Sequence, residues 1–165
     1  MNNLAQVIKV GIADLKIVKN PQKIRTSGLG SCVGVVLFDH RIKIAGMAHV
    51  MLPESSMSKQ EDKNRSKYAD TAIIDLVAGL VKQGGKKSRL QAKIAGGAQM
   101  FQFQTANNMM RIGPRNVDAV KKSLKELKIP LIAEDTGGKN GRTIEFNSET
   151  LQLNIRTVNK GESVI

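Results

Sequence analysis

Cysteine and aromatic residues are scarce in this chain of 165 residues. There is no tryptophan, and the aromatic side chains are Phe38, Tyr68, Phe101, Phe103 and Phe146. A hydrophobic core must therefore be built from aliphatic residues and methionine. Cys32 is the only cysteine, which excludes an intramolecular disulfide and is typical of an intracellular protein. A single domain of this length buries enough apolar surface to fold without cross-links.

Long hydrophobic runs are also missing. The longest uninterrupted apolar run, residues 35–38, is far shorter than the ~20 residues that a membrane-spanning helix needs. The first ten residues contain no basic stretch followed by an apolar segment, so we expect no secretory signal. Low-complexity tracts and repeats of fixed period are absent as well. These absences predict a soluble, cytoplasmic protein.

Positive charge is abundant, with 26 basic and 14 acidic residues and a net charge of +12. Such a field attracts nucleic acid, a membrane surface or an acidic protein. The excess is spread over residues 1–130 and does not form a basic arm. Binding of single-stranded nucleic acid also needs aromatic side chains on which bases stack, and few are present. We therefore expect no nucleic-acid binding and no membrane insertion, and an acidic protein stays a candidate partner.

Hydrophobic patterns predict an α+β domain with antiparallel-rich sheets. The two runs at 33–38 and 42–52 are apolar on both faces, so we expect layers above and below their sheet. Asn116 is the expected N-cap of the second helix, and residues 24–32 and 54–67 are expected to be loops, the latter mobile. Strands are predicted at residues 7–18, 33–38, 42–52, 90–95, 131–135, 142–147 and 150–158, and helices at about 68–82 and 117–127.

Cys32 is a candidate nucleophile because of the residue that its strand brings opposite to it. A hairpin turn centred between His40 and Arg41 pairs residues whose numbers sum to 81, so that Cys32 faces His49. Directly opposed residues share a face of the sheet, whereas a slip of one residue would separate them. The alternative is that Cys32 is a small buried hydrophobic residue and His49 a core histidine with one hydrogen bond.

A thiol beside an imidazole is the arrangement of a cysteine nucleophile with its general base. An imidazolium would lower the thiol pKa below the free value of about 8.5. A third polar group usually orients the imidazole, and Thr26 and Ser27 are both candidates, while His40 in the turn is expected to be solvated. The backbone N–H groups of a glycine-containing loop could bind substrate or stabilise an oxyanion, and this loop includes Ser27, Gly28, Gly30 and Ser31.

Other chemistries find little support in the sequence. GLGSCVG (residues 28–34) lacks the spacing of a dinucleotide-binding loop and leads into a strand, and no phosphate-binding loop of the GxxxxGK[ST] type is present. One cysteine and two histidines give no zinc spacing. Two glycine-containing segments, 96–101 and 112–116, are either tight turns that flank a sheet or segments whose Arg115 and Asn116 anchor a substrate or a loop.

Several motifs together resemble the chemoreceptor glutamine deamidases of the CheD family. RTSGLGSC (residues 25–32) and GMAHVMLP (46–53) form the most specific combination. The likeness covers about residues 8–158 and identifies residues 1–165 as a single CheD-like domain. The later segments follow in the same order: YAD (68–70), KIAGGAQMF (93–101), IGPRN (112–116), DTGG (135–138) and GR (141–142).

This resemblance implies a three-layer α/β/β sandwich related to the deamidase domain of cytotoxic necrotizing factor toxins. It implies a catalytic set of Cys32, His49 and Thr26 that converts glutamine side chains of methyl-accepting chemotaxis proteins to glutamate without cofactor or metal. Glutamyl methyl esters are implied as side substrates, and a CheC-type phosphatase as a partner that mimics the receptor. The alternative function is a regulatory binding partner that chiefly modulates the CheC phosphatase.

Overall fold

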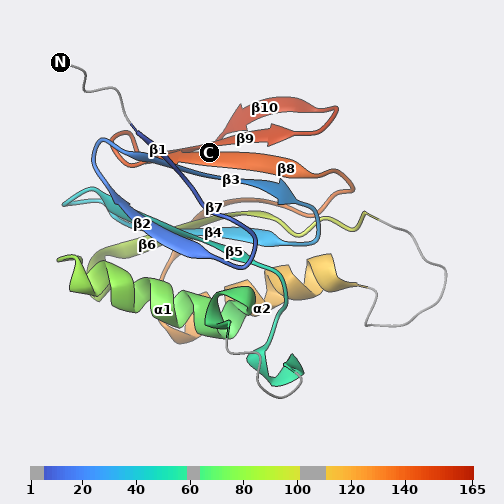
Figure 1. Cartoon of the computed structure of the whole chain (residues 1–165), viewed down its shortest axis with the longest axis horizontal. Coiled ribbons are helices and arrows are strands. Elements are labelled where there is room, and N and C mark those ends of the chain that lie inside the picture. Colours follow the sequence, from blue (N-terminus) through green and yellow to red (C-terminus); the bar gives the residue numbers. More distant parts are fainter. Residues whose placement is uncertain (1–5, 59–63, 101–110) are drawn as a thin grey trace.

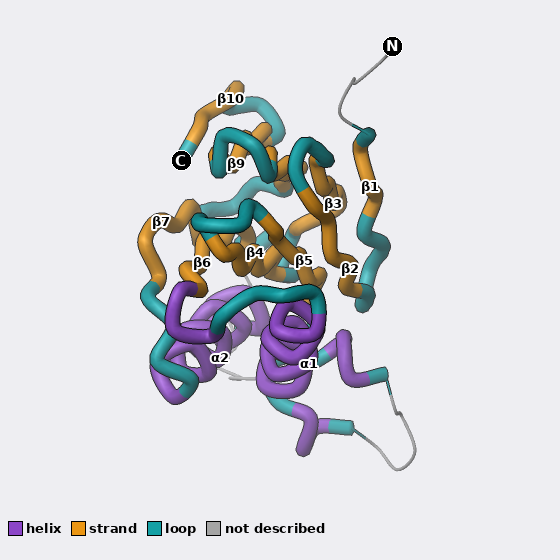
Figure 2. Tube along the Cα trace, turned by 90° about the vertical axis from the view of Figure 1, so that its left-hand side faces the viewer, coloured by secondary structure: helices purple, strands orange, loops and turns teal. Residues whose placement is uncertain are grey.

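The computed structural model describes residues 6–58, 64–100 and 111–165. These residues form three layers, with helices on one side, a central sheet, and a second sheet on the outside (Figures 1 and 2). The expected fold class, an α/β/β sandwich with antiparallel-rich sheets, is confirmed. The central sheet has the order β2 (Leu15–Lys19), β5 (Ile44–Val50), β4 (Val33–Asp39), β6 (Leu90–Gly96) and β7 (Leu131–Thr136). The outer sheet has the order β1 (Val7–Lys9), β3 (Lys23–Leu29), β8 (Arg142–Asn147), β9 (Gln152–Thr157) and β10 (Gly161–Val164).

Helices α1 (Ala69–Lys82) and α2 (Ile112–Glu126) cover the central sheet on the side away from the outer sheet. Short 3-10 helices occur at η1 (Ser55–Met57), η2 (Arg65–Lys67) and η3 (Lys87–Arg89). The segment 54–67 therefore contains two helical turns where the sequence predicted only loop, and its residues 59–63 lie outside the described residues. None of the helices in the described ranges is long and apolar enough to cross a membrane.

Strand β4 is buried on both faces and divides the interior into two hydrophobic clusters. Val35 and Leu37 belong to the cluster under the helices, whereas Val36 and Phe38 belong to the cluster between the sheets. In the second cluster the rings of Phe38 and Phe146 lie 5.2 Å apart. Strand β5 is likewise fully buried. The prediction that these two apolar runs are covered on both sides is confirmed.

The β4–β5 turn differs from the prediction by two residues. Asp39 pairs with Ile44, and the loop 40–43 is closed by a hydrogen bond from Lys43 N to Asp39 O of 2.9 Å, with Lys43 at φ 55°. His49 therefore lies opposite Gly34, not Cys32. Since side chains alternate with a period of two, a shift of two residues leaves His49 on the same face of the sheet as Cys32.

Four further boundaries differ from the sequence prediction. The stretch 7–18 is two strands, β1 and β2, that belong to different sheets. The expected loop 24–32 is strand β3 as far as Leu29. Helix α2 begins at Ile112, so Asn116 lies inside the helix and is not its N-cap. The C-terminal strand β10 was not predicted.

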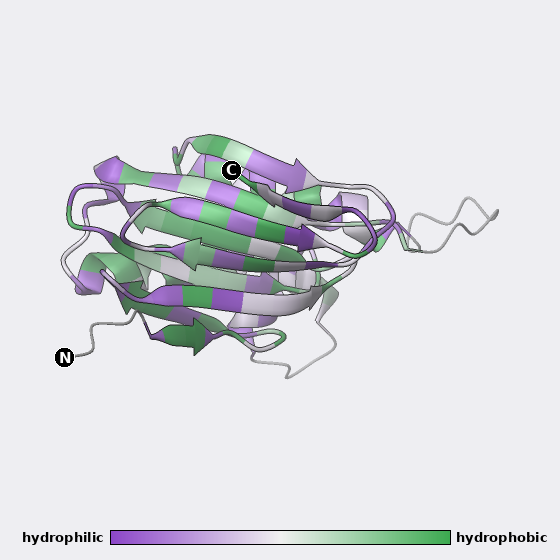
Figure 3. Cartoon of the chain, turned by 90° about the horizontal axis from the view of Figure 1, so that it is seen from above, coloured by the Kyte–Doolittle hydropathy of each residue, from purple (hydrophilic) through white to green (hydrophobic). Residues whose placement is uncertain are grey.

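The outer face of the second sheet is open. Along β8 and β9 buried side chains alternate with more exposed ones, and Figure 3 shows hydrophilic residues interleaved with hydrophobic ones along the strands of this face. This alternation is typical of an antiparallel sheet with one face in the core and one in water. The inward-facing residues complete the cluster between the sheets.

Candidate functional site

The imidazole of His49 and the hydroxyl of Thr26 meet between the two sheets. His49 on β5 is fully buried, and Thr26 on β3 is 2% exposed. The distance from Thr26 Oγ1 to His49 Nδ1 is 2.7 Å. Two residues from different layers and 23 positions apart in the sequence are thus joined by a short hydrogen bond. The structure brings together two of the three residues that the sequence and its family resemblance marked as catalytic.

This hydrogen bond determines which imidazole nitrogen carries a proton. Thr26 Oγ1 donates its single hydrogen to the backbone oxygen of Val10 at 2.8 Å. The hydroxyl must therefore accept its second bond, and His49 Nδ1 must be the donor. In the neutral imidazole, Nε2 then has a free lone pair. Nε2 is buried and has no hydrogen-bond partner among the described residues, so it is available as a base.

The neighbour of His49 on β4 has no side chain, and this allows the two sheets to lie close together beside the imidazole. A Cβ atom added to Gly34, which pairs with His49, would lie 2.5 Å from Ile144 Cδ1 and 3.3 Å from Leu29 Cδ1. The two sheets therefore approach closely at this position. The backbone of His49 is fixed by its N–H bond to Asp14 O at 3.0 Å and by its carbonyl, which accepts from Ala13 N at 3.1 Å.

Cys32 immediately precedes β4 and is half-buried against the cluster between the sheets. Burial raises the pKa of the Cys32 thiol above its ordinary value, although its own backbone N–H partly opposes this. Burial likewise lowers the pKa of His49. Both shifts favour a neutral thiol and a neutral imidazole. The direction of the Cys32 pKa shift is therefore opposite to the expected lowering, because burial outweighs the backbone hydrogen bond at Cys32 and also favours a neutral imidazole at His49.

The loop predicted to bind substrate or an oxyanion contains a β-bulge. Between the pairs Thr26–Ile144 and Leu29–Arg142 the β3 strand has one extra residue, and Gly28 adopts φ 72° there. The bulge lets both Thr26 and Leu29 point into the interior. Of the predicted loop residues, Ser27 and Gly28 are exposed. Gly30 and Ser31 are half-buried. Their role in binding stays a prediction.

A turn after β6 holds the backbone of Cys32. Gly97 N donates to Cys32 O at 2.9 Å, and Ala98 N donates to Gly30 O at 2.8 Å. Gly96 has φ 115°, and a Cβ atom on it would collide with Cys32 O. The glycines of this segment are required by close approach of two backbones. This finding favours the interpretation of the segment 96–101 as a tight turn. Its last residue, 101, lies outside the described residues.

Arg142 supports the same turn from the outer sheet. It is 6% exposed and donates from Nη1 to Gly96 O at 3.3 Å, while its Nη2 contacts Asp135 Oδ1 at 3.3 Å. Gly137 N also donates to Gly96 O, at 3.0 Å. Sequence reasoning assigned no role to Arg142 or Asp135, which appeared only as parts of motifs. The structure explains them as a scaffold beneath the turn that holds Cys32.

The second glycine-containing segment, 112–116, contacts the backbone next to Cys32. Asn116 is fully buried in α2 and donates from Nδ2 to Ser31 O and to Met51 O, both at 2.9 Å. Arg115 is half-buried beside it. Of the two roles left open by the sequence, the structure shows that Asn116 anchors the protein's own chain.

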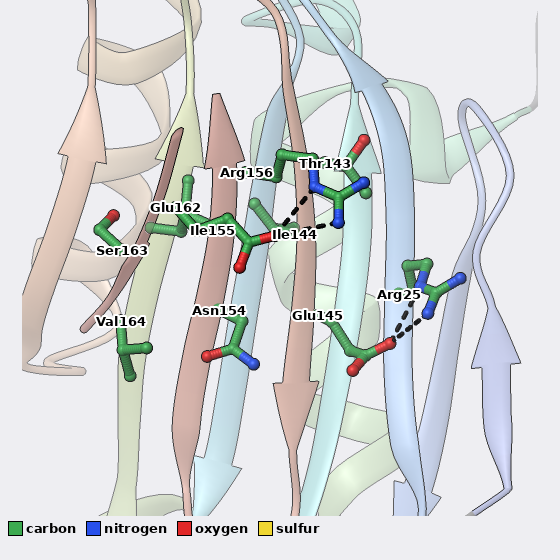
Figure 4. Close-up of a pocket in the computed structure, with 10 residues that line it drawn as sticks. All are labelled: Arg25, Thr143, Ile144, Glu145, Asn154, Ile155, Arg156, Glu162, Ser163 and Val164. Carbon is green, nitrogen blue, oxygen red and sulfur yellow. Dashed lines mark hydrogen bonds and ion pairs between the residues drawn. The ribbon is translucent and has the colours of Figure 1, made fainter. Parts of the chain in front are cut away.

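A pronounced hollow of the described surface lies elsewhere. It has a volume of about 380 Å³ and lies on the outer face of β3, β8, β9 and β10 (Figure 4). Two ion pairs cross it, Arg25 with Glu145 at 2.7 Å and Arg156 with Glu162 at 2.9 Å. Arg25 and Thr26 are consecutive on β3 and point to opposite faces. The hollow is therefore separated from Thr26 and His49 by the sheet itself.

Metal ligation has no geometric support in the part of the chain that the structure describes. Residues 6–58, 64–100 and 111–165 contain no group of three or more His, Cys, Asp or Glu side chains placed to hold a metal ion.

Comparison with known proteins adds the family. A family model described as "CheD chemotactic sensory transduction" matches residues 51–157, more than half of the chain. The chain belongs to the CheD family. The resemblance inferred from the sequence motifs is thereby confirmed.

Curated relatives of this CheD-family chain are similar over nearly their full length. A protein of Halalkalibacterium halodurans named "Chemoreceptor glutamine deamidase CheD" is 62% identical over 159 residues, which cover 96% of this chain and 98% of the relative. The protein of the same name from Bacillus subtilis is 55% identical over 161 residues, covering 98% and 97%. A solved structure, the Bacillus licheniformis hypothetical protein YfiH, is 14% identical with a TM-score of 0.47, covering 74% of this chain and 50% of that one.

Proposed function

We propose that this chain is a protein-glutamine deamidase that converts specific glutamine side chains of chemoreceptors to glutamate, with Cys32 as the nucleophile. Its curated relatives are named for this activity and match it from end to end. The geometric observation that carries the proposal is the bond from His49 Nδ1 to Thr26. This bond leaves Nε2 as the free base on the face of the sheet that Cys32 shares.

The first half of the reaction forms a thioester. His49 Nε2 accepts the thiol proton, and the Cys32 sulfur attacks the carboxamide carbon of the glutamine. The tetrahedral intermediate collapses when the protonated Nε2 gives its proton to the nitrogen, so that the C–N bond breaks and ammonia leaves. Thr26 keeps the Nδ1–H bond throughout and so fixes the ring orientation. Proton transfer in the complex is compatible with the neutral resting pair, since catalytic contacts often tighten only when substrate binds.

The second half consumes water. Nε2, again unprotonated, removes a proton from a water molecule that attacks the thioester carbon. The C–S bond breaks, glutamate is released, and Cys32 regains a proton. Backbone N–H groups of the loop containing Gly28 and Ser31 are proposed to stabilise the oxyanions of both halves, whereas Gly30 N already donates to Gly28 O at 3.1 Å. A glutamyl methyl ester would pass through the same thioester with methanol as the leaving group.

The partners follow from charge and family. The net charge of +12 attracts an acidic protein and supports a chemoreceptor helix as substrate. We propose that the reaction takes place in the cytoplasm and that a CheC-type phosphatase competes for the same site. A chiefly regulatory role is less supported, because the relatives are named for deamidation. Residues 1–165 are proposed to act as one domain, since β4 and β5 contribute to both hydrophobic clusters.

Mass spectrometry tests this proposal. A receptor fragment incubated with the wild-type chain should gain about 1 Da for each glutamine converted, because an amide becomes an acid. Cys32→Ala should give no gain, and we expect it to fold, because the side chain is small and half-buried. Absence of any gain with the folded wild-type chain, or an equal gain with Cys32→Ala, would refute the proposal.

A further inference from the structure

Asn116 joins the chain segments that carry Cys32 and His49. Its Nδ2 donates one hydrogen to Ser31 O, one residue before Cys32, and the other to Met51 O, two residues after His49, both at 2.9 Å. One side chain from α2 thus contacts the backbone beside the nucleophile and the backbone beside the base. It touches neither Cys32 nor His49 directly in any hydrogen bond.

This pair of hydrogen bonds, here called the Asn116 bridge, lies where the pairing of β4 with β5 ends. The register of β4 with β5 runs from Asp39–Ile44 to Val33–Val50 and stops there. Beyond that pair, Met51 N bonds to Lys67 O at 2.9 Å, so the chain after β5 turns toward η2. No strand pairing therefore fixes the distance between the residue before β4 and the residue after β5. The amide of Asn116 takes the place of the missing pair.

Packing holds Asn116 itself in one position. It is fully buried within α2. Gly113, one turn earlier, has no room for a side chain because Ala98 O lies against it, and Val117 packs on Gly97. The helix is thus pressed against the same turn that binds Cys32 O. Asn116 Oδ1 is buried and has no hydrogen-bond partner among the described residues. A buried unpaired oxygen is costly, and this cost partly offsets the stability that the two Nδ2 hydrogen bonds contribute.

We propose that Asn116 is a positioning residue that sets the approach of Cys32 to His49 Nε2. This inference rests on the proposed function. The reacting groups lie close to the end of the β4–β5 pairing, and a displacement of about 1 Å in such a site can cost about 100-fold in rate. The role acts through the backbone at Ser31 and Met51 and needs no contact with substrate.

Asn116→Leu tests the inference, because leucine nearly matches the shape of asparagine, favours helix and donates no hydrogen bond. We expect kcat for deamidation to fall by about 30- to 100-fold, with KM within twofold of wild type. Ser123→Ala is the matched control, since Ser123 is also buried on α2 but two turns further from Ser31. It should change neither constant. Circular dichroism and thermal melting establish that both variants are folded.

Asn116→Asp gives a second test that does not depend on the leucine variant. The introduced carboxylate would face two carbonyl oxygens, so the variant should be slow near neutral pH. Burial raises the pKa of such a group, and its protonated form regains one donor. The ratio of variant to wild-type kcat should therefore rise as pH falls, whereas it should stay constant for Asn116→Leu. A constant ratio for both variants would contradict the inference.

The outcomes also separate this inference from the proposed function. Suppose that the wild type is active. If Asn116→Leu then keeps kcat within twofold, or changes only KM, Asn116 does not position the pair. If wild type shows no deamidation, the proposed function fails, and the rate of Cys32 alkylation by iodoacetamide decides the inference. Loss of the bridge should expose the thiol, lower its alkylation midpoint and speed the reaction. Unchanged alkylation in Asn116→Leu would overturn the positioning role.

Discussion

Replacing Thr26 by valine removes one hydroxyl and keeps the shape of the side chain. Thr26 Oγ1 serves two buried partners, donating to Val10 O at 2.8 Å and accepting from His49 Nδ1 at 2.7 Å. The valine leaves both without a partner. Leaving a buried polar group unpaired costs about 1–3 kcal/mol. For two such groups we expect the free energy of unfolding to fall by roughly 2–6 kcal/mol.

The same substitution should also impair catalysis. Without a hydroxyl that accepts from Nδ1, the imidazole proton is no longer held on Nδ1 and can reside on Nε2 instead. The base that activates Cys32 is then present in only part of the molecules and in variable orientation. General acid–base catalysis contributes about 100- to 10,000-fold in rate, so we expect Thr26→Val to lose about 100-fold or more in kcat.

Thr26→Ser is the matched control, because it keeps the hydroxyl and loses only a methyl group. The lost burial costs about 1 kcal/mol, and kcat should stay within a few-fold of wild type. Urea unfolding gives the stability, and ammonia release from a receptor fragment gives kcat at a temperature where all variants are folded. Equal kcat for Thr26→Val and wild type, or equal losses for the valine and serine variants, would refute the role assigned to Thr26.

Two further predictions concern packing and pH. Gly34→Ala should lower the free energy of unfolding by about 1–3 kcal/mol through overpacking, since its Cβ would lie 2.5 Å from Ile144 Cδ1. Ile144→Val removes that atom and should restore part of the loss, as measured by urea unfolding. Additive losses in the double variant would contradict the close approach. Because burial raises the pKa of Cys32, the pH midpoint of its alkylation by iodoacetamide should lie above the ordinary thiol value of about 8.5. A midpoint below that value would instead show an ion pair with His49 in the free protein.

The sequence predicted the layered fold because burial leaves a clear pattern. Runs of apolar residues in β4 and β5 indicated a sheet covered on both faces, and the structure agrees. Pattern alone could not divide residues 7–18 between two sheets, because β1 and β2 are both short and the choice depends on tertiary pairing. The glycines of residues 24–32 suggested a loop, whereas a β-bulge at Gly28 accommodates them within β3.

The pairing of Cys32 with His49 was predicted from a register that proved two residues off. The turn has four residues and is centred one position further along the chain, with Lys43 in the left-handed region. Since the error was an even number of residues, the shared face was still predicted correctly. The place of Thr26 depends on contact between two sheets, and only the family resemblance selected it over Ser27. The sequence marked Asn116 as a possible anchor, but the two chain segments that it joins depend on helix packing and could not be predicted.

The central claim is that the Cys32 sulfur forms a thioester with the substrate. Trapping by hydroxylamine measures this most directly, because hydroxylamine intercepts a thioester and leaves a hydroxamate on the target side chain, about 16 Da heavier than glutamine. With the wild-type chain we predict hydroxamate at the same positions that are otherwise deamidated, and none with Cys32→Ala. Deamidation by wild type without any hydroxamate at high hydroxylamine concentration, or hydroxamate formed equally by Cys32→Ala, would contradict the account.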